Sequence, residues 1–226
     1  MIAYLSENAD KRIIEALEQE GFEIHTLAPF SALSHPVDTH ADMLLLSVGD
    51  VIFAPKGYNF DVPSTKKVIK IDEQMGEKYP SDVLLNIAIV GKNVFCNTKH
   101  ASKTVLEYLN ANGFAIHHVS QGYAHCSTCI VSENALISAD KGIIEVARKV
   151  GLDTLLISND HISLPPYDYG FIGGASGSCG DKIYFCGSLN HHPDGKEIRQ
   201  FCESHSKRVV ELCNSLLHDV GGILFI

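Results

Sequence analysis

A histidine and two cysteines stand at the start of one short apolar run in the sequence. Residues 120–131 read SQGYAHCSTCIV, which places His125 and Cys126 at the mouth of a predicted strand and Cys129 inside it. A thiol beside an imidazole at the start of a strand can be held as a thiolate and presented to a cleft, where it acts as a nucleophile. Cysteine more often fills space in a protein core, which is the role we expect for Cys129.

The composition predicts one compact cytoplasmic domain. The chain has 226 residues, of which 45% are apolar and 20% are charged, so it can bury a substantial core. Its formal net charge of −9, without any basic stretch, argues against a nucleic-acid partner and is compatible with a cationic small molecule. No apolar run approaches the roughly 18 residues of a membrane helix, and the N-terminus does not resemble a signal peptide. Seven cysteines, an odd number, favour reduced thiols.

Loop-to-strand junctions recur along the chain at a nearly constant spacing. They fall near His40, Asp82, His125 and Asp168, which are 42, 43 and 43 residues apart. A constant period of this size indicates stacked supersecondary units, here of the type ββαβ, and the chain has room for about five of them. The fifth unit is split, because an apolar strand at 1–5 begins the chain and another at 221–226 ends it.

We therefore predict an α/β fold, a five-bladed ββαβ α/β-propeller (pentein fold) that is circularly closed by pairing of the N- and C-terminal strands. An ordinary α/β sandwich with coincidental spacing is the alternative. We expect a single domain, 1–226, whose blades cover 221–226 plus 1–30, 38–75, 81–120, 123–160 and 166–215. The strands expected to open the second to fifth units are Met43–Val48, Leu84–Val90, Cys129–Val131 and one that starts at Phe171. The expected helices are Asp10–Glu20, Ala101–Asn110, Gly142–Val150 and Gly195–Glu203.

Four short motifs at these junctions resemble the pentein, or guanidine-modifying enzyme, superfamily, which includes arginine and agmatine deiminases and dimethylarginine hydrolases. THADM at 39–43 is similar to the H-x-D strand start of these enzymes, and LNIAIVG at 85–91 is similar to the N-F-x-I-x-N-G strand of agmatine deiminases. GYAHCS at 122–127 is similar to their G-G-N-I-H-C-I, which carries the nucleophilic cysteine. YDYG at 167–170 resembles an R-D-x-G motif, whose aspartate grips the guanidinium. More narrowly, the chain resembles an uncharacterised bacterial family assigned to that fold.

The sequence departs from the superfamily in two ways. The glutamate of the E-G-G-D motif, which orients the histidine in these enzymes, has no match, because VGGI at 220–223 stands in its place. The neighbouring Asp219 is the only substitute. The order of the units is also rotated, because this chain begins inside the unit in which the relatives carry that glutamate.

The resemblance implies a cysteine-dependent hydrolase or deiminase that acts on a small guanidino or amidino compound and uses neither a cofactor nor a metal. Cys126 would attack the guanidinium carbon and form a covalent intermediate, while His40 would protonate the leaving nitrogen and then activate water. A guanidinium is planar and permanently charged, so carboxylates must surround its nitrogens. Asp42 and Asp168 are the candidates for binding it, and Asp219 is the possible His-orienting acid.

Other interpretations of the same residues stay open. His40 could cap a loop, Asp42 could accept backbone N–H groups at a strand start, and Asp168 could form a turn. The chain could instead be a catalytically degenerate pentein that binds a small cationic ligand or a protein partner without turning it over. A third alternative is a metal or redox site at the C-x-x-C of residues 126–129. The glycine-rich stretch 173–180 lacks the lysine of a P-loop and is expected to form a flexible rim of the cleft. No feature of the sequence predicts an oligomeric state.

Overall fold

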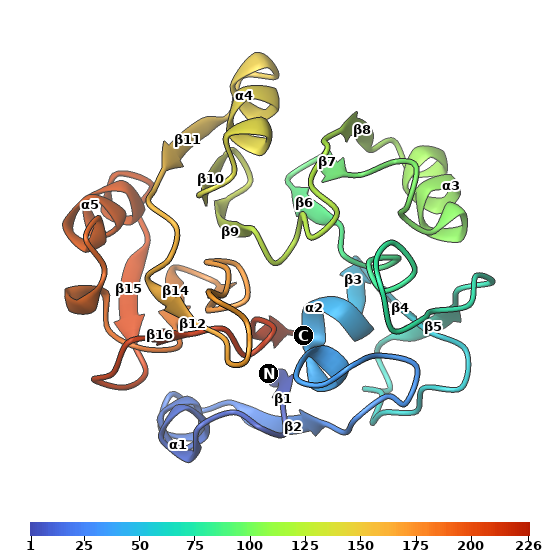
Figure 1. Ribbon diagram of the computed structural model, residues 1–226, viewed down its shortest axis with the longest axis horizontal. Coiled ribbons are helices and arrows are strands. Elements are labelled where there is room, and N and C mark those ends of the chain that lie inside the picture. The colour runs from blue at the N-terminus through green and yellow to red at the C-terminus, as the bar shows by residue number, and fades with distance from the viewer.

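Five three-stranded sheets follow one another along the chain in the computed structural model, which describes residues 1–226 (Figure 1). In each sheet the middle strand pairs antiparallel with one neighbour and parallel with the other. A further two-stranded sheet joins β12 (Ile162–Ser163) to β16 (Leu217–His218). In spatial order the five sheets are β17 (Leu224–Phe225), β1 (Ile2–Ser6) and β2 (Glu23–Leu27); β3 (Leu46–Val48), β4 (Val51–Ala54) and β5 (Lys67–Lys70); β6 (Ala88–Val90), β7 (Asn93–Cys96) and β8 (Ala115–His118); β9 (Thr128–Ser132), β10 (Ala135–Ser138) and β11 (Asp153–Leu156); and β13 (Ser176–Cys179), β14 (Lys182–Phe185) and β15 (Arg208–Glu211).

A helix connects the two parallel strands in four of the five sheets. The side chains of Asp10, Ser102 and Asp140 accept backbone N–H groups in the first turn of three of these helices, which fixes where each begins. The connection from β4 to β5 has no helix. The four predicted helices are confirmed to within two residues at each end, as α1 (Lys11–Gln19), α3 (Lys103–Ala111), α4 (Lys141–Lys149) and α5 (Gly195–Ser204).

The first and last strands of the chain pair with each other, as predicted. β1 runs antiparallel to β17, with Ala3 opposite Phe225, and the backbone N–H of Ile2 donates to the carbonyl of Ile226 (2.8 Å). Figure 1 shows the five sheets placed one after another around the middle of the molecule, with α1, α3, α4 and α5 on the outside and both chain ends near the centre. No single sheet closes on itself, so the closed five-bladed propeller stays a prediction.

Three of the strands expected to open a unit are shorter than predicted. The segment Met43–Val48 is divided between a short helix, α2 (Ala41–Leu44), and β3. The strand expected at Leu84–Val90 forms only in its last three residues, as β6, and the strand expected from Phe171 begins at Ser176. An apolar run does not distinguish a strand from another buried backbone conformation. The missing parts of these strands all lie in the segments that lead into the centre.

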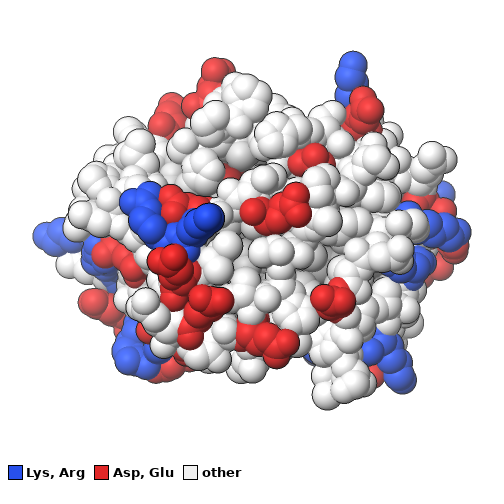
Figure 2. Space-filling model, turned by 90° about the horizontal axis from the view of Figure 1, so that it is seen from below, with Lys and Arg blue, Asp and Glu red and all other residues white.

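Acidic side chains are prominent on the surface, as the net charge of −9 leads one to expect. On the face shown in Figure 2, Asp and Glu side chains lie across the middle, whereas Lys and Arg form separate small groups, most of them toward the two sides. None of the helices has both the length and the apolar character needed to span a bilayer.

The C-terminal segment crosses directly over the residues that precede and begin α2. The backbone N–H of Asp42 donates to the carbonyl of Gly221 (2.9 Å). A Cβ placed on Gly221 would overlap the side chain and Cα of His40, and Gly221 has a φ of +79°. Only glycine suits this position, because it combines a left-handed backbone with a contact that leaves no room for a side chain.

We predict that Gly221→Ala destabilises the protein more than Gly113→Ala does. Gly113 also has a left-handed backbone, with φ of +75°, but a Cβ there would meet nothing within 4 Å. Both substitutions incur backbone strain of roughly 1–2 kcal/mol, and Gly221→Ala adds an overpacking cost of about 1–3 kcal/mol. Urea unfolding of the two variants measures the difference, and equal midpoints would contradict the close crossing.

Candidate functional site

A cavity of about 290 Å³ brings together four of the five predicted site residues, His40, Cys126, Asp168 and Asp219. They come from different parts of the chain: His40 immediately precedes α2, Cys126 precedes β9, and Asp219 follows β16. Three of them are buried, whereas Asp168 is exposed at the rim, in the loop between β12 and β13. The rest of the lining is apolar or aromatic and consists of Val37, Met43, Tyr123, Leu164, Tyr167, Tyr169 and Phe171.

Asp42, the fifth predicted residue, lines a separate pocket of about 180 Å³. Its carboxyl group nevertheless lies close enough to the Cys126 thiol to raise the pKa of that thiol. Asp219 in turn raises the pKa of Asp42. His125 also faces that separate pocket, and its Nδ1 atom has no hydrogen-bond partner. The imidazole that shares a cavity with Cys126 is therefore that of His40 and not that of its sequence neighbour.

The surroundings of Cys126 favour the thiol, which corrects the expectation of a thiolate. The side chain is only 4% exposed, and burial raises its pKa well above the usual range. The nearby carboxyl groups of Asp42 and Asp219 raise it further, because they disfavour a second negative charge. The Nδ2–H group of Asn86, which donates to Sγ over 2.8 Å, opposes this effect only in part.

Asn86 is a site residue that the sequence analysis did not single out. Its Oδ1 accepts hydrogen bonds from the backbone N–H groups of His125 (2.7 Å) and Cys126 (3.2 Å), and its Nδ2 donates to the carbonyl of Asp42 (3.2 Å) as well as to the thiol. The buried amide of Asn86 thus links the segment at Asp42, 44 residues before it, to the segment at His125, 39 residues after it. Asn86 is the only polar residue within the apolar run Leu84–Val90, and this exception in the pattern could have pointed to it.

Asp42 and Asp219 form a pair of buried carboxyl groups. Neither oxygen of Asp42 has a hydrogen-bond partner of ordinary geometry, and burial, with a further contribution from Asp219, raises its pKa to about 8. Burial also raises the pKa of Asp219, to about 6, although its oxygens accept from the backbone N–H groups of Phe171 (2.9 Å) and Gly221 (3.0 Å). Two carboxyl groups in one buried place disfavour double ionisation, so the pair retains a proton near neutral pH.

His40 lies beside Asp219, the substitute for the missing glutamate. The distance from Nδ1 of His40 to Oδ1 of Asp219 is 3.8 Å. Burial lowers the pKa of His40 to about 4, despite an opposing effect of Asp38. A carboxylate next to Nδ1 favours the tautomer that carries the proton there, which leaves Nε2 free to accept one. The geometry thus suits a neutral imidazole that can act as a base.

The glycine-rich stretch 173–180, expected to be a flexible rim, is closely packed at its first residues, whereas Gly180 is exposed. A Cβ on Gly174 would overlap the carboxylate of Asp219, and one on Gly173 would overlap the carbonyl of His125. The backbone N–H of Gly174 also donates to the carbonyl of Cys126 (3.1 Å). These two glycines let the chain segments that carry Cys126 and Asp219 approach each other, because any side chain would separate them.

Aromatic rings form one wall of the cavity. The rings of Tyr123 and Phe171 are stacked, with centroids 6.2 Å apart, and Tyr169 meets Phe171 edge-on at 6.0 Å. The hydroxyl of Tyr123 donates to Oδ2 of Asp82 over 2.6 Å, which fixes the orientation of that ring.

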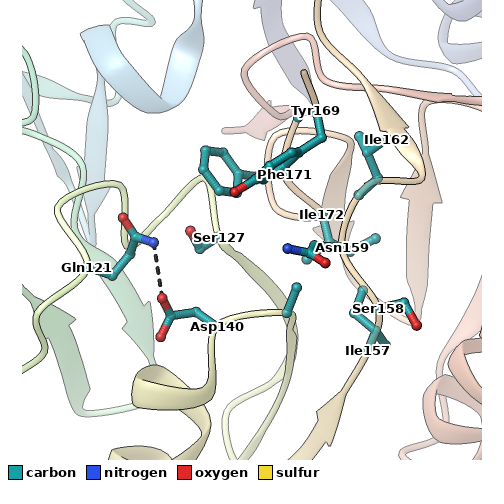
Figure 3. A pocket seen from close by; sticks show the side chains of 12 residues that line it. Gln121, Ser127, Asp140, Ile157, Ser158, Asn159, Ile162, Tyr169, Phe171 and Ile172 are labelled. Atoms are coloured by element: carbon teal, nitrogen blue, oxygen red, sulfur yellow. Dashed lines mark hydrogen bonds between the residues drawn. The ribbon is translucent and has the colours of Figure 1, made fainter. Parts of the chain in front are cut away.

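A smaller pocket of about 90 Å³ lies on the other side of Tyr169 and Phe171 (Figure 3). Nε2 of Gln121 donates there to Oδ2 of Asp140 (3.1 Å), and Oγ of Ser127 is buried without a partner. Ser158 and Asn159 lie across the pocket from Gln121 and Asp140, and none of the predicted site residues lines it.

The alternative of a metal site at Cys126 and Cys129 has no geometric support. Cys126 lines the cavity, whereas Cys129 packs in an apolar cluster with Val131 and Ile183, as expected for a core residue. No group of three or more His, Cys, Asp or Glu residues is arranged to hold a metal ion.

The sequence matches, over residues 4–224, the model of a family described as a family of unknown function (DUF6873). The chain belongs to this family. No curated protein matches the sequence significantly.

Several solved structures share the fold of this DUF6873 chain. DDAH from Pseudomonas aeruginosa, a mutant complexed with citrulline, has a TM-score of 0.56 at 12% identity, over 89% of this chain and 78% of that one. The amidinotransferase SxtG from Microseira wollei, of the saxitoxin biosynthetic pathway, has a TM-score of 0.53 at 10% identity, over 95% and 78%. A dimethylarginine dimethylaminohydrolase adduct with S-methyl-L-thiocitrulline has a TM-score of 0.54 at 11% identity, over 92% and 91%. All have the pentein fold, and so has this chain; at such identities the likeness is one of fold alone.

We predict that the free energy of unfolding falls between pH 6.5 and pH 8 and that Asp42→Asn removes most of this fall. The pKa of Asp42 is raised to about 8, so over this range the folded protein binds a proton that the unfolded chain has lost, and stability decreases by roughly 1 kcal/mol per pH unit. The lowered pKa of His40, about 4, acts in the opposite direction but only below about pH 6.5, where the unfolded imidazole takes up its proton.

Urea unfolding at several pH values between 6.5 and 8 checks this prediction. Asp42→Asn should be more stable than the wild type at pH 8, with a flatter profile. The matched control is Asp50→Asn, because the side chain of Asp50 is 64% exposed, and it should keep the wild-type slope. Parallel profiles for wild type and Asp42→Asn would show that the buried carboxyl is not the titrating group.

Proposed function

We propose that this chain is a cysteine-dependent hydrolase or deiminase that acts on a small guanidino or amidino compound through a covalent intermediate on Cys126. The observation that carries the proposal is a cavity in which a thiol, an imidazole and the buried carboxyl group of Asp219 lie together, with no Lys or Arg in the lining. A second buried carboxyl group, that of Asp42, lies close to the thiol from a separate pocket. Buried carboxyl groups without a cation favour a ligand that brings one. The proposal includes one domain over residues 1–226, in which the five sheets are the blades of a closed propeller around this cavity.

A bound guanidinium would change the charge state of the whole site. Next to Cys126 it would lie in the field of both Asp42 and Asp219, and its positive charge would lower the pKa of both carboxyl groups and of the thiol. Asp168 is exposed at the rim of the cavity. This position suits long-range attraction of a cationic ligand better than direct hydrogen bonds to the guanidinium nitrogens inside the cavity. The thiolate would therefore form when the ligand is bound and not before.

The chemistry then needs one nucleophile and one base. Sγ of Cys126 attacks the central carbon, and the thiol proton passes to His40, where the carboxylate of Asp219, 3.8 Å from Nδ1, would offset part of the charge of the imidazolium. The carbon–nitrogen bond breaks, and the amine or ammonia leaves with the proton from His40. His40 next takes a proton from water, and the resulting hydroxide attacks the same carbon. The carbon–sulfur bond then breaks as His40 returns its proton to Sγ, which restores the thiol and the neutral imidazole. The net reaction exchanges one nitrogen of the substrate for one oxygen of water.

Binding without turnover is the second candidate function. It is favoured by the burial of Cys126, which raises the pKa of its thiol well above the usual range, and by the 3.8 Å gap between His40 and the shorter acid Asp219. In that case the site would hold a small cation with the thiol protonated throughout.

Alkylation of Cys126 separates a site that activates its thiol from one that does not. We expect cationic chloroacetamidine to label Cys126 at least about tenfold faster than neutral chloroacetamide does, once both rates are normalised to Cys179. A tenfold effect corresponds to one pKa unit, or about 1.4 kcal/mol. Cys179 is the internal control, because it is partly exposed and lies outside the cavity.

Mass spectrometry of peptides from partially labelled protein gives the two rates. Asp42→Asn should reduce the preference for chloroacetamidine at Cys126 and leave Cys179 unchanged. If the two cysteines show the same ratio of rates, the carboxyl groups do not recruit a cation to the thiol.

Turnover assays test the role of His40. Release of ammonia or amine from a panel of small guanidines is expected to fall by roughly 10²–10⁴-fold in His40→Ala and to vanish in Cys126→Ala. His192→Ala is the matched control, because His192 is also buried (5% exposed) but does not line the cavity. A near-wild-type rate in His40→Ala would remove it from the mechanism, and binding of guanidines without any release would favour the second candidate.

A further inference from the structure

The lining of the cavity contains no Lys or Arg that could pair with an acidic substituent of a ligand. Apart from His40 and Asp219, which are buried, Asp168 is the only residue in its lining that carries a charge, and it is an acid at the mouth. The remainder is aliphatic or aromatic. The pocket on the other side of Tyr169 and Phe171 also lacks Lys and Arg, and its one charged residue is Asp140 (Figure 3).

We propose that the site takes small guanidines or amidines that have no carboxylate and whose substituent is aromatic or apolar. This inference rests on the proposed function, since it assumes that the cationic end of the ligand lies beside Cys126. It assigns to the aromatic wall the binding of the other end.

A carboxylate on the ligand would find no Lys or Arg in this cavity. A carboxylate that leaves water needs a cation or several hydrogen-bond donors, and guanidinium-like side chains are the usual partners. The side-chain donors in the cavity other than His40 and Cys126 are tyrosine hydroxyls, and that of Tyr123 already donates to Asp82. Asp168 at the mouth would repel a carboxylate, and the net charge of −9 over the chain acts in the same direction.

The aromatic wall is built to receive a flat or apolar group. Tyr123 is fixed by its hydrogen bond to Asp82 and stacks with Phe171, so the two rings present a preformed surface. Tyr167 and Tyr169 are 50% and 37% exposed at the same cavity, so a ligand could remove their rings from water. Burial of this surface against an apolar substituent is favourable, and an aromatic substituent adds ring-to-ring contacts.

The size of the cavity limits the ligand to a small molecule. Its volume of about 290 Å³ lies just below the roughly 300 Å³ at which pockets for drug-sized ligands begin. A free guanidine with a short substituent fits this volume, whereas an arginine side chain within a folded protein would have to bring its backbone past Tyr167 and Tyr169 at the mouth.

Calorimetric titration of the wild-type protein with two matched guanidines tests the inference. Butylguanidine and 4-guanidinobutyrate have the same chain and differ in a methyl group against a carboxylate. We expect butylguanidine to bind at least tenfold more tightly than 4-guanidinobutyrate, and benzylguanidine to bind more tightly than unsubstituted guanidine.

Two variants locate the effect on the named residues. Asp168→Arg should raise the affinity for 4-guanidinobutyrate at least tenfold, whereas Asp50→Arg, which changes the same charge away from the cavity, should not. Phe171→Leu keeps an apolar wall and should lower the affinity for benzylguanidine more than that for butylguanidine.

The outcomes distinguish this inference from the proposed function. Equal or tighter binding of 4-guanidinobutyrate, or an unchanged ligand preference in Asp168→Arg and Phe171→Leu, would overturn the inferred ligand class while guanidine binding itself stood. If neither unsubstituted guanidine nor any of the substituted probes binds, the proposed function fails together with the inference.

Discussion

Two carboxyl groups and a thiol share one buried place in this protein without a positive charge among them, and most features of the site follow from that. Ionisation of Asp42, Asp219 and Cys126 together would place several negative charges in a region from which water is excluded, at a cost of several kcal/mol for each uncompensated ion. Retained protons avoid this cost, as the raised pKa values of all three groups indicate. A cation placed beside these groups would lower their pKa values and so change the charge state of the site.

The fold assembles this place by bringing together segments that are far apart in sequence. The segments 40–42, 125–126, 173–174 and 219–222 meet at the centre, and they are joined by backbone hydrogen bonds such as Asp42 N–H to Gly221 and Gly174 N–H to Cys126. Glycines at the crossings replace side chains that would overlap a neighbouring segment. The pairing of β1 with β17 fixes the C-terminal segment near the N-terminal one. Because each contact depends on another, the geometry of the site is a property of the whole fold and not of any single motif.

The sequence predicted the helices and strands better than the conformation of the segments that connect them at the centre of the molecule. A constant period and alternating apolar runs identify strands and helices, since burial on a sheet or a helix face leaves a regular trace. Three of the sequence's candidate site residues, His40, Cys126 and Asp219, line one cavity, and their roles stay predictions. It missed the helical turn α2, the amide of Asn86 and the packed glycines at 173–174, because these depend on side-chain to backbone hydrogen bonds and on close approach between distant segments. It assigned the thiol the wrong protonation state for a related reason: two acids that are distant in sequence lie beside it.

In the proposed reaction, the fixed position of Asp219 would determine how well it can stabilise a charged imidazole at His40. Asp219 cannot swing toward His40 freely, because each of its oxygens accepts a backbone N–H group, from Phe171 and from Gly221. It therefore stays 3.8 Å from Nδ1 of His40, and burial holds the pKa of that imidazole at about 4. In the proposed reaction, a bound cation would draw the remaining proton off the pair of carboxyl groups and lower the pKa of the thiol, so that the nucleophile would form only when the ligand is present. Asp219 would then offset part of the charge that His40 takes up with the thiol proton.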